Sequence, residues 1–105
     1  MTLPQLKKYD VTQKVIEALA DSESRAILFS IIKKGMTASE LSEKLKIPLS
    51  SVYKKLSDLE ELTLIEVEKW LISDKGRKFK MYKSRISKAD ISIRKPDPIL
   101  NLVSN

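Results

Sequence analysis

The 105-residue sequence contains no cysteine and no histidine. Without these residues it can form no disulfide, no thiolate or imidazole metal site, and no catalytic triad that needs an imidazole base. It also has no apolar run near the roughly 20 residues that a membrane span requires, and residues 1–10 lack the apolar segment of a secretory signal. These absences exclude most hydrolytic enzymes, and they predict a soluble, cytoplasmic protein with no catalytic residues, metal or cofactor.

The charges that are present lie unevenly along the chain. Apolar residues make up 42% and charged residues 32%, which supports one small folded domain, and the formal net charge is +6. Residues 69–105 carry ten basic and three acidic side chains, whereas residues 1–68 carry ten basic and eleven acidic ones. Because clustered cations displace counterions from phosphates, this asymmetry predicts a polyanion-binding surface, with a solvated basic strand pair as the alternative.

Four short helices are expected in the first 62 residues. Thr12 can cap a helix that ends at residue 20. A second helix should begin at residue 21 or 22 and end at Lys33-Lys34, with Gly35 as a left-handed cap. Thr37 and Glu40 have the spacing of a capping box, which predicts the start of a third helix.

The third helix should meet a fourth across a tight turn. Pro48 disfavours helical geometry at the residue before it, so the third helix must end near residue 46. Pro48 also suits the first turn of a helix over 48–62, in which Val52, Leu56 and Leu59 share one face.

Beyond residue 62 the alternation of apolar residues predicts a β-hairpin. A strand over 65–72 should return over 78–85, with Gly76 in the left-handed position of the turn. The side of the strand that carries the apolar residues changes near Lys69, which predicts a β-bulge or a strand break there.

The last residues are predicted to lie outside the main domain. Ile91 and Ile93 fit a short extra strand, and Asp97 between two prolines fits a turn or an extended linker. We therefore expect a winged-helix DNA-binding domain over residues 1–95 and a short C-terminal tail over 96–105.

This order of elements predicts an α+β, mainly α fold, a winged helix-turn-helix with three to four helices plus a β-hairpin wing. In such a fold the helix over 48–62 enters the major groove, and the basic hairpin over 73–80 lies on the backbone or in the minor groove. At about 100° per residue, Ser50 and Lys54 point away from the core, while Ser51 and Tyr53 lie on the flanks. Lys55 sits nearer the core, where it meets either a phosphate or an acidic neighbour. The predicted DNA-binding residues are Ser50, Ser51, Tyr53, Lys54, Lys55, Lys75, Arg77, Lys78 and Lys80.

Three stretches carry a resemblance to a known family: LADSESRAILFSII, TASELSEKLKIPLSSVYKKLSDLEELTLI and SDKGRKFKMY. From Leu19 to about Arg85 the chain resembles the ArsR-like winged-helix transcription regulators. The resemblance implies that Ser50, Ser51, Tyr53 and Lys54 occupy recognition-helix positions and that residues 75–78 form the wing tip. Metal control is not implied, because the Cys and His ligands of the family's sensors are absent, and Thr63 stands where the family usually has Gly. The short tail leaves residues 3–20, residues 99–103 or both as the interface of a homodimer.

The leading hypothesis is thus a sequence-specific regulator of double-stranded DNA. The alternative is a winged-helix subunit of a transcription-related assembly that docks through exposed apolar residues of the tail. RNA binding is disfavoured because the aromatic residues form no tight cluster in the sequence; these are Tyr9, Tyr53, Trp70, Phe79 and Tyr82. An enzyme is least expected, since the carboxylates of Glu66 and Glu68 fit a solvent-facing strand better than an acid–base pair.

Overall fold

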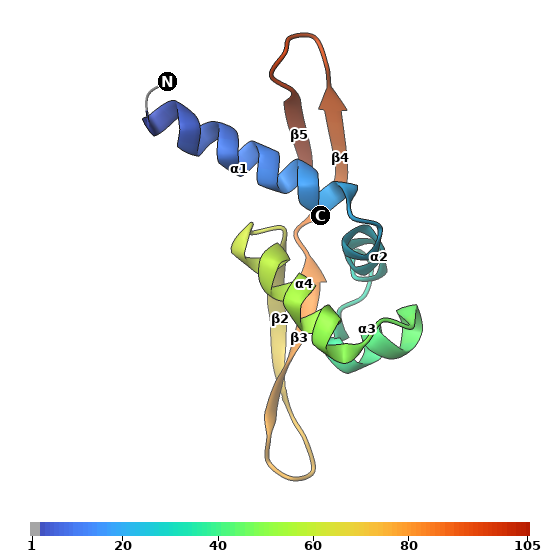
Figure 1. The fold of residues 1–105 in the computed structure, drawn as a ribbon. Coiled ribbons are helices and arrows are strands. Elements are labelled where there is room, and N and C mark those ends of the chain that lie inside the picture. Colours follow the sequence, from blue (N-terminus) through green and yellow to red (C-terminus); the bar gives the residue numbers. More distant parts are fainter. Residues whose placement is uncertain (1–2) are drawn as a thin grey trace.

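A computed structural model describes residues 3–105, with side chains from residue 11 onward. It shows a helical body with two β-hairpins at opposite ends (Figure 1). The elements are α1 (Leu3–Ala20), α2 (Ser22–Ser30), β1 (Met36–Thr37), α3 (Ala38–Leu45), α4 (Leu49–Glu61), β2 (Ile65–Ile72), β3 (Lys78–Ser84), β4 (Ile86–Ser92) and β5 (Ile99–Ser104). This arrangement confirms the predicted α+β winged helix-turn-helix, and no helix within the described residues has the length and hydropathy of a membrane span.

The first helix is longer than predicted. α1 already begins at Leu3, so Thr12 lies in its interior and does not cap it. The extension is physically reasonable, because Pro4 sits in the first turn, where its missing N–H is not needed, and good helix formers follow. Arg25 closes the other end of α1 by donating to the carbonyls of Leu19 and Ala20 at 2.8 and 2.9 Å.

The second helix begins as predicted and ends earlier. The Asp21 carboxylate accepts the backbone N–H of Ser24 at 2.9 Å, and the helix stops at Ser30. The prediction of Gly35 as a left-handed cap is wrong, because Gly35 is not among the residues with positive φ. A Cβ at this buried position would press on the Glu68 carboxylate and on the Met81 side chain, so a larger residue here would require those flexible side chains to move.

The turn between α3 and α4 follows the predicted chemistry. Thr37 and Glu40 form both bonds of the capping box, at 3.2 and 2.9 Å. Lys46 ends α3 in the left-handed conformation with φ 58°, and Pro48 stands just before α4 as its N-cap. The inner face of α4 is buried in the core, as expected, through Val52, Leu56 and Leu59.

The wing pairs with the body through a three-stranded sheet in the order β1-β3-β2. The predicted irregularity near Lys69 is confirmed as a register shift of β2 against β3 between Val67 and Lys69, without a break in the strand. The turn is also confirmed: Gly76 has φ 80°, and the Ser73 N–H bonds the Arg77 carbonyl at 2.8 Å. The sheet buries Leu64, Ile65 and Tyr82 against the helices.

The C-terminal segment differs from the expected tail. Residues 99–104 form β5, which pairs antiparallel with β4 from Ile86 opposite Ser104 to Ser92 opposite Ile99. The two prolines lie in the connection between these strands, where no ladder N–H is needed. Ile91 is a β4 residue as predicted, whereas Ile93 lies just beyond its end. The extended conformation of residues 99–104 depends on their pairing with β4, which begins at Ile86, well before the short strand predicted around Ile91.

Candidate nucleic-acid interface

The outer face of α4 carries the predicted recognition residues in accessible positions. Ser50, Tyr53 and Lys54 are exposed, and Ser51 is half-buried. The Lys54 side chain is 74% exposed, and its ammonium lies 2.9 Å from the carboxylate of Asp58 one turn later. Such an exposed i,i+4 pair contributes only a few tenths of a kcal/mol, so Lys54 can exchange Asp58 for a phosphate or a base edge at little cost.

Lys55 meets an acidic neighbour. Its side chain is 23% exposed, and its ammonium donates to Asp21 at 2.8 Å and lies 3.6 Å from Glu23. The hydrogen bond from Lys55, followed by the bonds from Ser24, lowers the pKa of Asp21 to about 2. The same bond to Asp21 raises the pKa of Lys55. The interaction ties α4 to the start of α2 and occupies the ammonium.

The wing presents its cations in two different settings. Lys75, Arg77 and Lys78 are exposed around the turn, where the Ser73 hydroxyl accepts the Arg77 backbone N–H at 3.1 Å. Lys80 lies farther from the tip and is less exposed. Its ammonium is 5.4 Å from the centroid of the Trp70 ring and 4.0 Å from the Glu60 carboxylate. The tip charges are thus free to meet a polyanion, and Lys80 is held against the wing.

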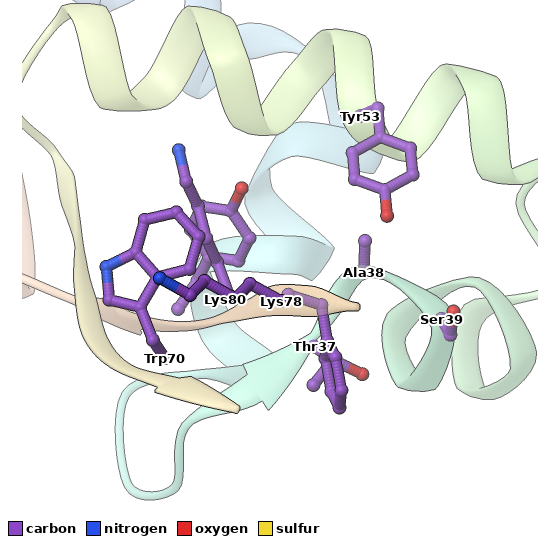
Figure 2. Close-up of a pocket in the computed structure, with 9 residues that line it drawn as sticks. Thr37, Ala38, Ser39, Tyr53, Trp70, Lys78 and Lys80 are labelled. Carbon is purple, nitrogen blue, oxygen red and sulfur yellow. The ribbon is translucent and has the colours of Figure 1, made fainter. Parts of the chain in front are cut away.

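A groove joins α4, the start of α3 and the wing. It has a volume of about 600 Å³ and is lined by Thr37, Ala38, Ser39, Tyr53, Trp70, Lys78, Phe79, Lys80 and Tyr82. In Figure 2 the Tyr53 side chain extends from α4 toward Ala38, while Trp70 and Lys80 project from the wing. The recognition helix and the wing therefore border one continuous surface, as the predicted DNA-binding mode requires.

The groove brings together residues that the sequence analysis left apart. Of the predicted site residues, Tyr53, Lys78 and Lys80 line it. Trp70, Phe79 and Tyr82 line it too, so four of the five aromatic residues considered for stacking border one groove, and the side chain of Tyr9 lies outside the described part. The strand pattern contained part of this signal, because Trp70 pairs directly with Lys80 across the hairpin and cross-strand partners share a face. Burial, and then the Glu60 carboxylate, raise the pKa of Tyr82, which forms part of the groove wall.

Two acidic residues of β2, Glu66 and Glu68, lie in surface ion pairs. Glu66 lies 3.9 Å from Arg85, and Glu68 lies 3.9 Å from Lys83. Among the residues with described side chains, no group of three or more acidic residues is placed to hold a metal ion.

Comparison with known proteins supports the same architecture. Residues 19–68 match a family model described as a helix-turn-helix domain. NolR from Sinorhizobium fredii has a similar structure, with a TM-score of 0.63 and 19% identity, covering 80% of this chain and 78% of NolR. Reduced HlyU from Vibrio cholerae gives a TM-score of 0.59 and 18% identity over 79% of this chain and 81% of HlyU. No curated protein matches the sequence significantly.

Proposed function

Because residues 19–68 match a family model described as a helix-turn-helix domain, we propose a binding mode for a DNA-binding transcription regulator. In this mode α4 enters the major groove of duplex DNA and the wing contacts the backbone or the minor groove. The single observation that carries the proposal is the continuous surface on which α4 and the wing meet. We also propose that the regulator acts in the cytoplasm.

The charge along α4 sets its orientation on DNA. Lys54 and the small hydroxyl residues Ser50 and Ser51 lie in its first half, whereas the carboxylates of Asp58 and Glu61 lie in its second half. Phosphates repel carboxylates, and a helix N-terminus favours anions. The N-terminal half of α4 should therefore approach the duplex first.

The contacts divide into two kinds. On α4 the proposed residues are Ser50, Ser51, Tyr53 and Lys54, with Lys54 placed for guanine O6 and N7 or for a phosphate. On the wing Lys75, Lys78 and Lys80 supply backbone charge, and Arg77 fits a narrow minor groove. Lys55 is left out of this set, because Asp21 and Glu23 already hold its ammonium.

The direct test measures duplex affinity at several salt concentrations for the wild type and for the variants Lys54→Ala and Arg77→Ala. Each variant should bind more weakly, and for every phosphate contact removed the slope of log K against log salt should become shallower by about 0.9. Unchanged affinity and unchanged slope in both variants would remove this site assignment.

A homodimer through α1 and the β4–β5 hairpin completes the proposal. Cross-strand partners share a face, so Ile91 with Leu100 and Ala89 with Leu102 form one apolar face of the hairpin. Ile91 and Leu102 remain exposed on it, and an isolated two-stranded hairpin is only marginally stable in water. A second copy of this chain would cover the face through a two-fold contact, with half-sites about 34 Å apart on DNA.

Sedimentation equilibrium of the full chain tests the dimer. The wild type should sediment at twice the chain mass, and Ile91→Lys and Leu102→Lys should shift it to the monomer while the circular dichroism of the helices is kept. A monomeric wild type would reject the homodimer. It would favour the alternative in which this apolar face docks another subunit of a transcription-related assembly.

A further inference from the structure

The groove between α4 and the wing contains a feature that duplex binding does not require. Trp70 is 58% exposed although it is the largest apolar side chain in the sequence. Phe79, a further wall residue, is also exposed. A large aromatic side chain that is exposed at the edge of a groove is available to contact a ligand there.

The charge of the groove indicates the kind of ligand. Its lining includes two ammonium groups, two hydroxyl residues at the start of α3 and no carboxylate. Another groove, of about 380 Å³ between α1, α2 and α4, has two lysines in its lining as well, but there they are outnumbered by four acidic residues, namely Glu17, Asp21, Asp58 and Glu61. The aromatic groove is therefore suited to a ligand that combines flat rings with negative charge.

We propose that this groove, lined by Tyr53, Trp70, Phe79 and Tyr82 with Lys78 and Lys80, binds single-stranded DNA by stacking an unpaired base on Trp70. Aromatic side chains combined with a basic groove are the features by which proteins bind single strands without reading sequence. The volume of about 600 Å³ falls within the range of pockets that enclose small organic molecules.

The geometry favours an unpaired base over a paired one. Inside a duplex both faces of each base are stacked on neighbouring bases and cannot reach an indole, whereas a single strand can turn its bases outward. The Lys80 ammonium lies over the Trp70 ring, 5.4 Å from its centroid, so a base that stacks on this face must displace the ammonium, which can then contact the phosphate linked to that base. Lys78 lines the same groove and supplies a second cation for the backbone.

This site overlaps the proposed duplex surface only in part. Lys78 and Lys80 belong to both, but Trp70 and Phe79 belong to the groove, and Lys54 and Arg77 lie outside its lining. A substitution at Trp70 or Phe79 should therefore weaken single-strand binding alone, and a substitution at Lys54 or Arg77 should weaken duplex binding alone.

Intrinsic fluorescence gives a direct experiment, because Trp70 is the only tryptophan. Oligo-dT added to the full-length protein at low salt should quench its emission and saturate. If two phosphates are contacted, the slope of log K against log salt should be about −1.4. Free thymidine monophosphate, added in a parallel titration, should quench only at much higher concentrations, because it offers one phosphate and no neighbouring nucleotides.

Substitutions at Trp70 test whether oligo-dT binding depends on its aromatic ring. By anisotropy of labelled oligo-dT, Trp70→Ala should bind about tenfold more weakly, which corresponds to the loss of one stacked base, and Trp70→Phe should retain most of the affinity. Ile72→Ala serves as the matched control, because Ile72 is an exposed apolar residue of the same strand outside the groove lining, and it should bind like the wild type.

Two results would overturn the inference. The first is the absence of saturable Trp70 quenching by oligo-dT, and the second is equal oligo-dT affinity of the wild type and Trp70→Ala. Lys54→Ala separates this site from the duplex site, since it should weaken duplex binding and leave oligo-dT binding unchanged. Saturable quenching by apolar peptides in place of oligo-dT would point to a protein ligand and would also reject the proposal.

Discussion

The Lys55 ammonium lies 2.8 Å from the Asp21 carboxylate, and this contact joins two helices through residues 34 positions apart in the chain. The same Asp21 oxygen accepts the backbone N–H and the hydroxyl of Ser24 at 2.9 and 2.8 Å. One carboxylate thus both starts α2 and anchors α4. The link adds to the stability of the fold, whereas the orientation of α4 is set by its buried face of Val52, Leu56 and Leu59.

The Asp21 link predicts a pH-dependent contribution to stability. Its pKa falls to about 2 in the fold from an ordinary value of 3.8, so the folded state binds the proton more weakly than the unfolded state does. The charged carboxylate therefore stabilises the fold above about pH 4, and this contribution is lost as the pH falls toward 2. Because the Asp21 side chain is 42% exposed, solvent screening limits the effect to about 1 kcal/mol.

Urea unfolding of the wild type and of Asp21→Asn at a series of pH values checks this. Asn keeps a capping oxygen and loses the charge, so the variant should be less stable at pH 7, and the difference should vanish near pH 2. If the difference in the free energy of unfolding between the wild type and Asp21→Asn does not change with pH, the charge of Asp21 does not contribute to stability.

Two adjacent lysines should give opposite phenotypes. Lys54→Gln should weaken duplex binding roughly tenfold and leave the free energy of unfolding within about 0.5 kcal/mol of the wild type. Lys55→Gln should lower the free energy of unfolding by up to about 1 kcal/mol and leave duplex affinity within about twofold. Anisotropy with a labelled duplex and denaturant titration of the same preparations measure both quantities. A loss of DNA affinity in Lys55→Gln without a loss of stability would contradict the assignment.

The sequence predicted best where a local rule fixes the backbone. The capping box of Thr37 and Glu40, the left-handed Gly76 and the register shift beside Lys69 all follow from short-range geometry. The prediction for Gly35 is wrong because the helix ends at Ser30, several residues before it, and the backbone at Gly35 does not take the left-handed conformation. The partner of Lys55 and the grouping of Trp70 with Tyr53 were out of reach, since both depend on how distant elements pack.

Thr63 offers a stability test. It has φ 61°, and the bonds from Thr63 to Glu60 and from Leu64 to Leu59, at 2.9 and 3.0 Å, form a Schellman end to α4. A β-branched residue in this conformation costs about 1 kcal/mol or more, which glycine avoids. Thr63→Gly should therefore raise the melting temperature by about 4 °C.

Lys46 supplies the comparison for Thr63. It is also left-handed, with φ 58°, but its side chain is unbranched at Cβ. Lys46→Gly should therefore raise the melting temperature by less than Thr63→Gly does in the same thermal scan. Equal melting temperatures for the wild type and Thr63→Gly would mean that the backbone strain is compensated elsewhere.

Asp58 should restrain DNA binding through Lys54. Its carboxylate lies 2.9 Å from the Lys54 ammonium on the exposed face of α4, so a phosphate must displace it and then lie near a negative charge. Asp58→Asn removes both penalties, and we expect duplex affinity to rise about threefold at low salt and less at high salt, because salt screens exposed charges. In the Lys54→Gln background this gain in duplex affinity should shrink, since part of it acts through the freed Lys54 ammonium.

Asp90→Asn is the control for net charge. It makes the same charge change on the β4–β5 hairpin, away from α4 (Figure 1), and should alter duplex affinity less. Equal gains from Asp58→Asn and Asp90→Asn would indicate an effect of net charge alone and would argue against α4 as the DNA-facing helix.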